Sequence, residues 1–258
     1  AASYDNNASQ IMLQNTSFVE TQSKRQFMNA NFLSSIRFAG CSFLQNSVDR
    51  WARFGAGSQW PFMTLLMVDR AAMADCTFES NSLLSDGIWE PADRNYLLFM
   101  LVSTATFGNC SFTANRASNI VRFADNTKNA SFSHCEFRQN AQDVDTSSEA
   151  VVYIPTPARE SAKVSLAGCL FEDNNMTPIY LQGAAKDTNT HGNRSFGGLQ
   201  LLQVSLAQCF FFRNRGHGAV VVNDTSWTAL TTVEISSREN NSRNNTSTSK
   251  CTGVFVAL

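Results

Sequence analysis

The chain has 258 residues, of which 43% are hydrophobic and 16% charged, and its formal net charge is −1. This balance argues against a nucleic-acid or membrane-surface partner, because both attract strongly basic chains. The longest apolar runs, 61–68 and 96–102, are far too short to cross a bilayer.

A repeated pattern runs along almost the whole chain: apolar-x-apolar-x-x-Cys-x-Phe-x-x-Asn. Two degenerate copies, Thr16-Phe18-Thr21 and Ile235-Ser237-Asn240, flank six full copies, and the Cys-equivalent positions lie 25 to 40 residues apart. A repeat of this length indicates a solenoid. The full copies are Cys41-Phe43-Asn46, Cys76-Phe78-Asn81, Cys110-Phe112-Asn115, Cys135-Phe137-Asn140, Cys169-Phe171-Asn174 and Cys209-Phe211-Asn214.

Each copy predicts three short strands. In the copy at 164–174, apolar residues alternate over 164–166 and again over 169–171, which is strand periodicity. The small pair Ala167-Gly168 shifts the phase and predicts a bend. We expect Asn174 to occupy a sharp turn, because Asn tolerates positive φ. A third apolar run follows at 179–181.

These elements predict an all-β fold, a right-handed parallel β-helix (β-solenoid) of about eight three-sided coils. Equivalent strands of stacked coils pair in parallel, and the crossover rule makes the connection right-handed. Like residues should then form ladders, with the phenylalanines stacked inside and the asparagines joined at one corner. Spacings above about 25 residues are read as loop insertions.

The pattern resembles that of the right-handed parallel β-helix (pectate-lyase-like) superfamily over about residues 11–258. More narrowly, Phe-x-x-Asn followed by Gly-x-Ala-apolar at 211–220 resembles the repeats of polymorphic outer-membrane and adhesin-like surface proteins. The resemblance implies the fold far more than the function, because the superfamily holds lyases, hydrolases and epimerases as well as phage tailspikes and surface adhesins. The chain departs from the adhesin pattern in its cysteine column and in mostly lacking Gly-Gly-Ala-Ile.

Six of the seven cysteines occupy one column, and Cys251 lies outside it. One interpretation is a ladder of disulfides or metal-binding thiolates. The other is a stack of buried, small apolar side chains, which free cysteine suits. Neighbouring Cβ atoms about 4.8 Å apart are too far for a disulfide, and no zinc-type spacing is present. We expect no metal and no cofactor.

Ten Asn-x-Ser/Thr sequons among 24 asparagines suggest a secreted glycoprotein carrying N-linked glycans. The alternative is that an Asn/Ser/Thr-rich surface produces sequons by composition. We expect secretion to an extracellular or cell-surface location. The sequons are at Asn7, Asn15, Asn109, Asn129, Asn175, Asn193, Asn223, Asn240, Asn244 and Asn245.

We interpret residues 1–258 as a single β-helix domain. Neither end shows a convincing polar cap, which solenoids need, so the domain is expected to be a segment of a longer solenoid. The alternative is that the last residues pair with a partner chain.

Candidate catalytic groups are scattered. Gly216-His217-Gly218 resembles a hydrolase element of the superfamily, but the paired aspartates that accompany it are absent. Asp143 and Asp145 could grip a cation only weakly, and His134 and His191 have no recognisable partner. We therefore expect no catalytic residue.

Two surface features are candidates for binding. Insertions after Asn46 and Asn81 should lie side by side and form an aromatic and basic protrusion that docks a partner chain or stacks on sugars, or else a small core beneath the loops. An outward apolar row could contact another chain or lie under the insertion at 186–198. The protrusion contains Arg50, Trp51, Arg53, Trp60, Trp89, Arg94 and Tyr96, and the row contains Leu170, Phe210 and Phe212.

The sequence thus favours a non-catalytic extracellular scaffold, one stretch of a glycosylated β-solenoid in a surface fibre, appendage or wall assembly. The expected partners are N-linked glycans and other protein chains. The alternatives are a polysaccharide lyase, hydrolase or epimerase of the same fold, and a carbohydrate-binding module that uses the Trp51 and Trp89 corner.

Overall fold

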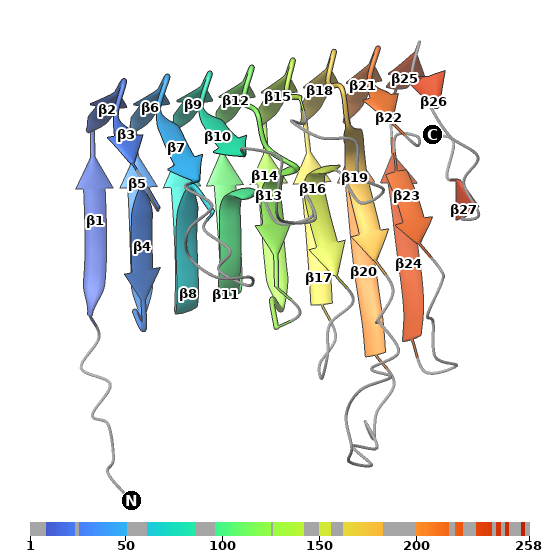
Figure 1. Cartoon of the computed structure of the whole chain (residues 1–258). Coiled ribbons are helices and arrows are strands. Elements are labelled where there is room, and N and C mark those ends of the chain that lie inside the picture. The colour runs from blue at the N-terminus through green and yellow to red at the C-terminus, as the bar shows by residue number, and fades with distance from the viewer. Residues whose placement is uncertain are drawn as a thin grey trace, which may run out of the picture.

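The structure is a computed structural model, and every regular element in its described residues is a β-strand. Figure 1 shows these strands side by side in chain order, from β1 in blue to β24 in red. The described residues are 9–23, 26–50, 61–85, 96–124, 126–141, 150–155, 162–182, 200–216, 220–223, 231–238, 241–243, 246–247 and 254–255.

The largest sheet contains two series of strands that share the long strands β8 (Met63–Ala74) and β11 (Tyr96–Gly108). The first series pairs β1 (Gln10–Gln14), β5 (Ser35–Ala39), the second halves of β8 and β11, β14 (Asn129–Ser133), β17 (Ala162–Ala167), β20 (Gln200–Ala207) and β24 (Thr231–Arg238). The second series pairs β4 (Met28–Asn31), the first halves of β8 and β11, β13 (Asn119–Phe123), β16 (Ala150–Pro155), β19 (Thr177–Gln182), β23 (Val220–Asn223) and β27 (Val254–Phe255).

A third series forms a separate sheet of three-residue strands. All pairs in the three series are parallel except that of β23 with β27. The third sheet contains β2 (Ser17–Val19), β6 (Ser42–Leu44), β9 (Thr77–Glu79), β12 (Ser111–Thr113), β15 (Glu136–Arg138), β18 (Leu170–Glu172), β21 (Phe210–Phe212) and β25 (Asn241–Arg243). Two small parallel sheets contain β3 (Gln22–Ser23), β7 (Ser47–Arg50) and β10 (Ser82–Ser85), and β22 (Arg215–Gly216) and β26 (Thr246–Ser247).

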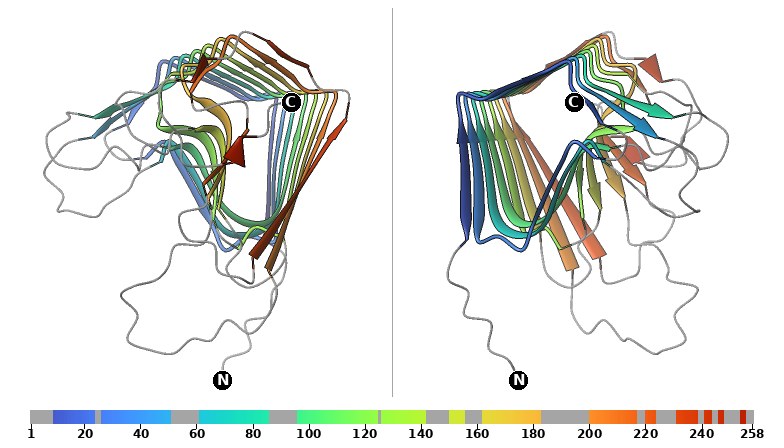
Figure 2. Two further views of the ribbon diagram at one scale, coloured as in Figure 1. Left: turned by 90° about the vertical axis from the view of Figure 1, so that its right-hand side faces the viewer. Right: turned by 60° about the vertical axis from the view of Figure 1, so that its left-hand side comes forward.

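The strands pair with their equivalents one repeat later, as the sequence predicts. Phe43 pairs with Phe78, and Phe112 pairs with Phe137. Viewed from the end of the stack, the three series lie around a common interior (Figure 2). The fold is therefore all-β, with stacked parallel sheets compatible with a β-solenoid.

Two of the strands are longer than the sequence suggests. In β8 and β11, the third strand of one repeat runs directly into the first strand of the next, through the corner. The pairing between them shifts register between Leu101 and Val102. Met67 lies at this shift in β8, with φ at 52° and its side chain 58% exposed. It is an extra residue that bends the strand, as β-bulges do.

The last repeat was assigned to the wrong register. The prediction placed Ile235 at the cysteine position and Ser237 at the phenylalanine position. The structure instead pairs Ile235 with Val204, and Ser242 with Phe211. The segment after residue 235 is rich in Asn and Ser and carries no Cys-x-Phe signature, so its sequence could not fix the register.

The expected role of the column asparagines at the corner also needs correction. The positive φ belongs to the residue before each asparagine, for example φ 53° at Ala114 and φ 54° at Asp173. A second bend precedes each cysteine, at Gly168 with φ 63° and at His134 with φ 52°. The predicted bend at Ala167-Gly168 is thus confirmed, and Asn174 itself does not adopt the positive φ of the turn.

The side chains of the column asparagines form a buried ladder of hydrogen-bonded amides. The Asn115 Nδ2 donates to the Phe78 carbonyl oxygen at 2.9 Å and to the Asn140 Oδ1 at 3.1 Å. Its Oδ1 accepts from the Asn81 backbone N at 3.1 Å and from the Asn81 Nδ2 at 3.0 Å. The predicted polar ladder is confirmed, and its six members are all fully or almost fully buried: Asn46, Asn81, Asn115, Asn140, Asn174 and Asn214.

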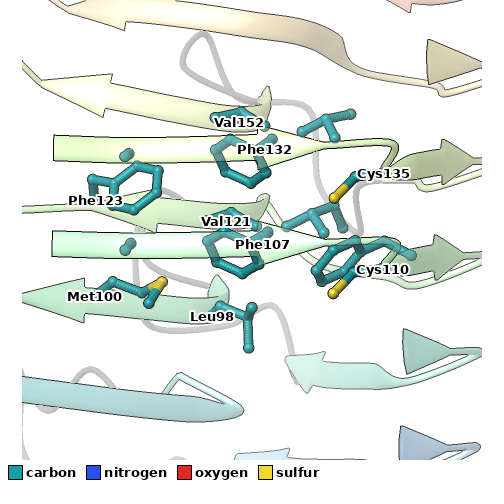
Figure 3. Packing of buried hydrophobic residues seen from close by; sticks show 14 of the residues in the cluster. Leu98, Met100, Phe107, Cys110, Val121, Phe123, Phe132, Cys135 and Val152 are labelled. Atoms are coloured by element: carbon teal, nitrogen blue, oxygen red, sulfur yellow. The ribbon is translucent and has the colours of Figure 1, made fainter. Parts of the chain in front are cut away.

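Phenylalanine rings fill the interior beside this ladder. Stacked pairs in the third sheet have ring centroids 4.6 to 5.1 Å apart, and each adds roughly 0.5–1.5 kcal/mol beyond burial. Phe107 and Phe132, on β11 and β14, stack at 4.5 Å and face the same interior (Figure 3). The predicted ladder comprises Phe18, Phe43, Phe78, Phe112, Phe137, Phe171 and Phe211.

The six column cysteines are free thiols and buried. The Cys110 Sγ donates to the Gly108 carbonyl oxygen at 3.4 Å and to the Met73 carbonyl oxygen at 3.5 Å. The hydrogen bond with the neighbouring Cys135 thiol, together with burial, raises the pKa of Cys110 to about 12. The column therefore consists of small, buried core side chains, the second of the two expected arrangements.

Candidate interaction surface

An apolar patch lies on the outer face of β18 and β21. Phe171 and Phe211 are fully buried, so the residues on either side of them point outward. Phe210 is 41% exposed, its ring lies 6.2 Å from that of Phe212 at 9°, and it pairs with the half-buried Leu170. The structure thus brings the three predicted residues of the outward row together on one surface.

Charged side chains border this patch. The Arg213 Nε contacts the Asp173 Oδ1 at 2.6 Å, and its Nη2 contacts the Glu172 Oε1 at 2.9 Å. The Arg213 hydrogen bond lowers the pKa of Asp173. On the far side, the Arg138 Nε lies 3.2 Å from the Glu136 Oε2. Exposed pairs such as these add only about 0–1 kcal/mol to stability. They also give the apolar patch a polar rim, which is the usual arrangement of a protein interface.

A second group of aromatic residues lies on the outer side of the second series. The Arg122 guanidinium lies 4.7 Å from the centre of the Tyr96 ring and 3.9 Å from that of Tyr153, which stacks on Tyr180 at 5.5 Å. All three tyrosines are buried, and burial raises the pKa of Tyr153 to about 12. Asn119, next to them on β13, is fully buried, and neither its Nδ2 nor its Oδ1 has a hydrogen-bond partner among the described residues.

Tyr96, one of the predicted partner contacts, is therefore part of a small buried core and is only 3% exposed. The other members of the predicted protrusion cannot be placed. Arg50 ends β7, but its side chain lies outside the described residues, as do Trp51, Arg53, Trp60, Trp89 and Arg94. The sequence contains an indication of this small core, because Arg122 and Tyr180 occupy the same outward position within their apolar runs.

Four of the predicted glycosylation sites are described with their side chains. Asn15, Asn109, Asn129 and Asn175 are all exposed, which is the geometry a glycan requires. For Asn223 only the backbone is described. Asn7, Asn193, Asn240, Asn244 and Asn245 lie outside the described residues.

The residues considered for chemistry remain apart or unplaced. His134 is exposed at its corner, where its ring packs over Gly168. Among the described residues, no three His, Cys, Asp or Glu side chains come together as a potential metal site. His191, His217, Asp143, Asp145 and Cys251 lie outside the described ranges.

No protein-family model matches the chain, and no curated protein matches it either. Within the part of the chain that the structure describes, no helix is long and apolar enough to span a membrane.

Proposed function

We propose that residues 1–258 form one domain, a right-handed parallel β-helix of about eight three-sided coils. Support comes from the three series of strands, which repeat in the same order and pair one repeat apart. A strand that returns to pair in parallel with its predecessor does so by a right-handed crossover in nearly all proteins. The resemblance to the β-helix superfamily and to adhesin-like repeats points the same way.

We further propose that the chain is a non-catalytic extracellular scaffold, a stretch of a surface fibre, appendage or wall assembly that carries N-linked glycans. The observation that carries this proposal is the continuity of the ladders, because the residues most strictly repeated in the sequence fill the interior. The repeated residues therefore stabilise the stack of strands, and its outer surface remains available for contacts with partners.

The outer surface supports contacts with two kinds of partner. The patch of Leu170, Phe210 and Phe212, with its charged rim, suits a second protein chain in an assembly. The exposed Asn15, Asn109, Asn129 and Asn175 suit N-linked glycans. N-linked glycans in turn favour a secreted or cell-surface protein.

The test is production of the full chain in a eukaryotic secretory host, followed by glycopeptide mass spectrometry and turnover assays on uronate polymers with and without calcium. We expect glycans on exposed sequons and no turnover. Turnover that Asp69→Asn abolishes would overturn the scaffold in favour of a polysaccharide-active enzyme. Absence of glycan at every sequon would overturn the assignment as a glycoprotein. Binding on a glycan array that Trp51→Ala and Trp89→Ala abolish would instead favour a carbohydrate-binding module.

A further inference from the structure

A hollow of about 420 Å³, lined by polar residue types, opens at the corner where β5, β8 and β11 turn from the second series into the first. Two adjacent residues from each of these three strands or their approaches line it, with Gln10 of β1 at one end. The six are Ser34, Ser35, Asp69, Arg70, Ser103 and Thr104.

The two charged side chains of this hollow are available to bind a ligand. Asp69 and Arg70 are both exposed, and neither side chain has a hydrogen-bond or ion-pair partner among the described residues. A free carboxylate accepts several hydrogen bonds, a free guanidinium donates several, and the hydroxyls of Ser35 and Thr104 do both. The two charges cancel, so the lining suits a neutral ligand rich in hydroxyl groups, such as a sugar.

One predicted glycosylation site borders the hollow directly. Asn129 pairs with Thr104, which pairs with Arg70, and the three therefore share one row on the outer face of the first series. Strand spacing places Asn129 about 5 Å from Thr104 and about 10 Å from Arg70 along this row. The backbone N of the preceding Lys128 donates to the Ser103 carbonyl oxygen at 3.0 Å, which fixes the two segments together.

We propose that the N-linked glycan on Asn129 folds back into this hollow and is held there by Asp69 and Arg70. Attachment raises the effective concentration of the sugar to the millimolar range, so a weak site is occupied. This inference rests on the glycoprotein assignment made above.

The experiment uses the glycosylated full chain and an endoglycosidase that cuts between the first two sugars. The release rate at Asn129 is compared with the rates at the exposed Asn109 and Asn175 of the same molecule. We expect release at Asn129 to be about tenfold slower in the native protein, since a glycan docked for about nine-tenths of the time is exposed for the rest. The three rates should be equal after denaturation.

Variants separate docking from crowding. The double substitution Asp69→Ala with Arg70→Ala should bring the rate at Asn129 up to that at Asn109, whereas Arg37→Ala, an exposed arginine on the same face outside the hollow, should not. Equal native rates at the three sites, slow release that the double variant leaves unchanged, or an empty Asn129 beside occupied Asn109 and Asn175 would each overturn the inference. Empty sequons throughout would overturn the glycoprotein assignment itself.

Discussion

At the residue scale, the asparagine column explains why one amide must recur at every corner. Each side chain from Asn81 to Asn174 donates to a phenylalanine carbonyl one repeat earlier and to the next amide in the column. It also accepts the backbone N–H and the side-chain N–H of the preceding asparagine. Among the common side chains, only Asn and Gln combine two N–H donors with a carbonyl acceptor, and the shorter Asn places both close to the backbone.

Removing one amide from the middle of the ladder should be costly. Asn115→Ala deletes four hydrogen bonds in a buried site. The Asn81 backbone N–H loses its side-chain acceptor, and the Phe78 carbonyl, the Asn81 Nδ2 and the Asn140 Oδ1 each lose one bond. At about 1 kcal/mol for each bond, the free energy of unfolding should fall by about 4 kcal/mol, as measured by urea unfolding. The exposed Asn126→Ala is the control and should change it by less than about 0.5 kcal/mol. Equal effects of the two substitutions would contradict the ladder.

The thiol column makes stability depend on alkaline pH. Neighbouring thiols and burial raise the pKa values of Cys110, Cys135 and Cys169 to about 12, from an unfolded value of 9.0. The folded state therefore binds more protons than the unfolded state above pH 9, and stability should fall as the pH rises from about 9 to about 12. Cys209, whose pKa is lowered by the hydrogen bond from Cys169, opposes this trend with a single group.

The measurement is the urea midpoint at pH 8 and at pH 10.5. The midpoint should be lower at pH 10.5, and Cys110→Ala should reduce the difference, because it removes one group whose pKa shifts on folding. An unchanged midpoint would show that these thiols are not held neutral by the fold.

At the element scale, the bends depend on residues held at positive φ, and at Gly40 and Gly168 that residue must also be small. A Cβ on Gly168 would lie 2.5 Å from the His134 Nδ1, and its φ is already 63°. We expect Gly168→Ala to lower the free energy of unfolding by about 1–2 kcal/mol. In a His134→Ala background the loss should be smaller, because the ring that meets the new methyl group is gone.

A double-mutant cycle measured by urea unfolding isolates this contact. Gly108→Ala is the matched control, since Gly108 has no positive φ and a Cβ there meets only the Ser133 Oγ at an ordinary 3.5 Å. A cost for Gly168→Ala that is the same in both backgrounds would assign the whole effect to the backbone.

Strand periodicity and the repeat predicted most elements, because each strand places alternate residues in a common interior. The Phe and Asn ladders followed from spacing alone. Two kinds of detail could not be predicted from the spacing. The merging of two strands into β8 depends on the bulge at Met67, which no periodicity signals. The register of β25 was misread, because a serine stands at the phenylalanine position in both the predicted and the observed register, Ser237 and Ser242.

The surfaces were less predictable than the interior. The row of Leu170, Phe210 and Phe212 could be read from a single strand pair, since its members flank inward phenylalanines. The hollow at Asp69 and Arg70 could not, because it joins residues from four repeats at a corner whose geometry the sequence does not specify. Burial of Tyr96 likewise depends on its contact with Arg122, more than twenty residues away.

At the scale of the whole molecule, stacking means that the distance between two equivalent residues in space does not depend on how many residues lie between them in the chain. One outward row contains Arg37, Ala72, Thr106, Ser131, Ser165 and Ser205, each paired with the next. Consecutive members should therefore lie about 4.8 Å apart, although the chain between Ser165 and Ser205 is longer than that between Ser131 and Ser165.

The most direct test of this stack is electron paramagnetic resonance on pairs of spin labels placed at Arg37 and, in turn, at Ser131, Ser165 and Ser205. The stack predicts separations of about 14, 19 and 24 Å, which rise by one strand spacing at each step. The native column thiols are buried and should not compete for the label. Separations that follow the length of the intervening chain, or that fail to rise in equal steps, would contradict the stacked-coil architecture on which the scaffold proposal depends.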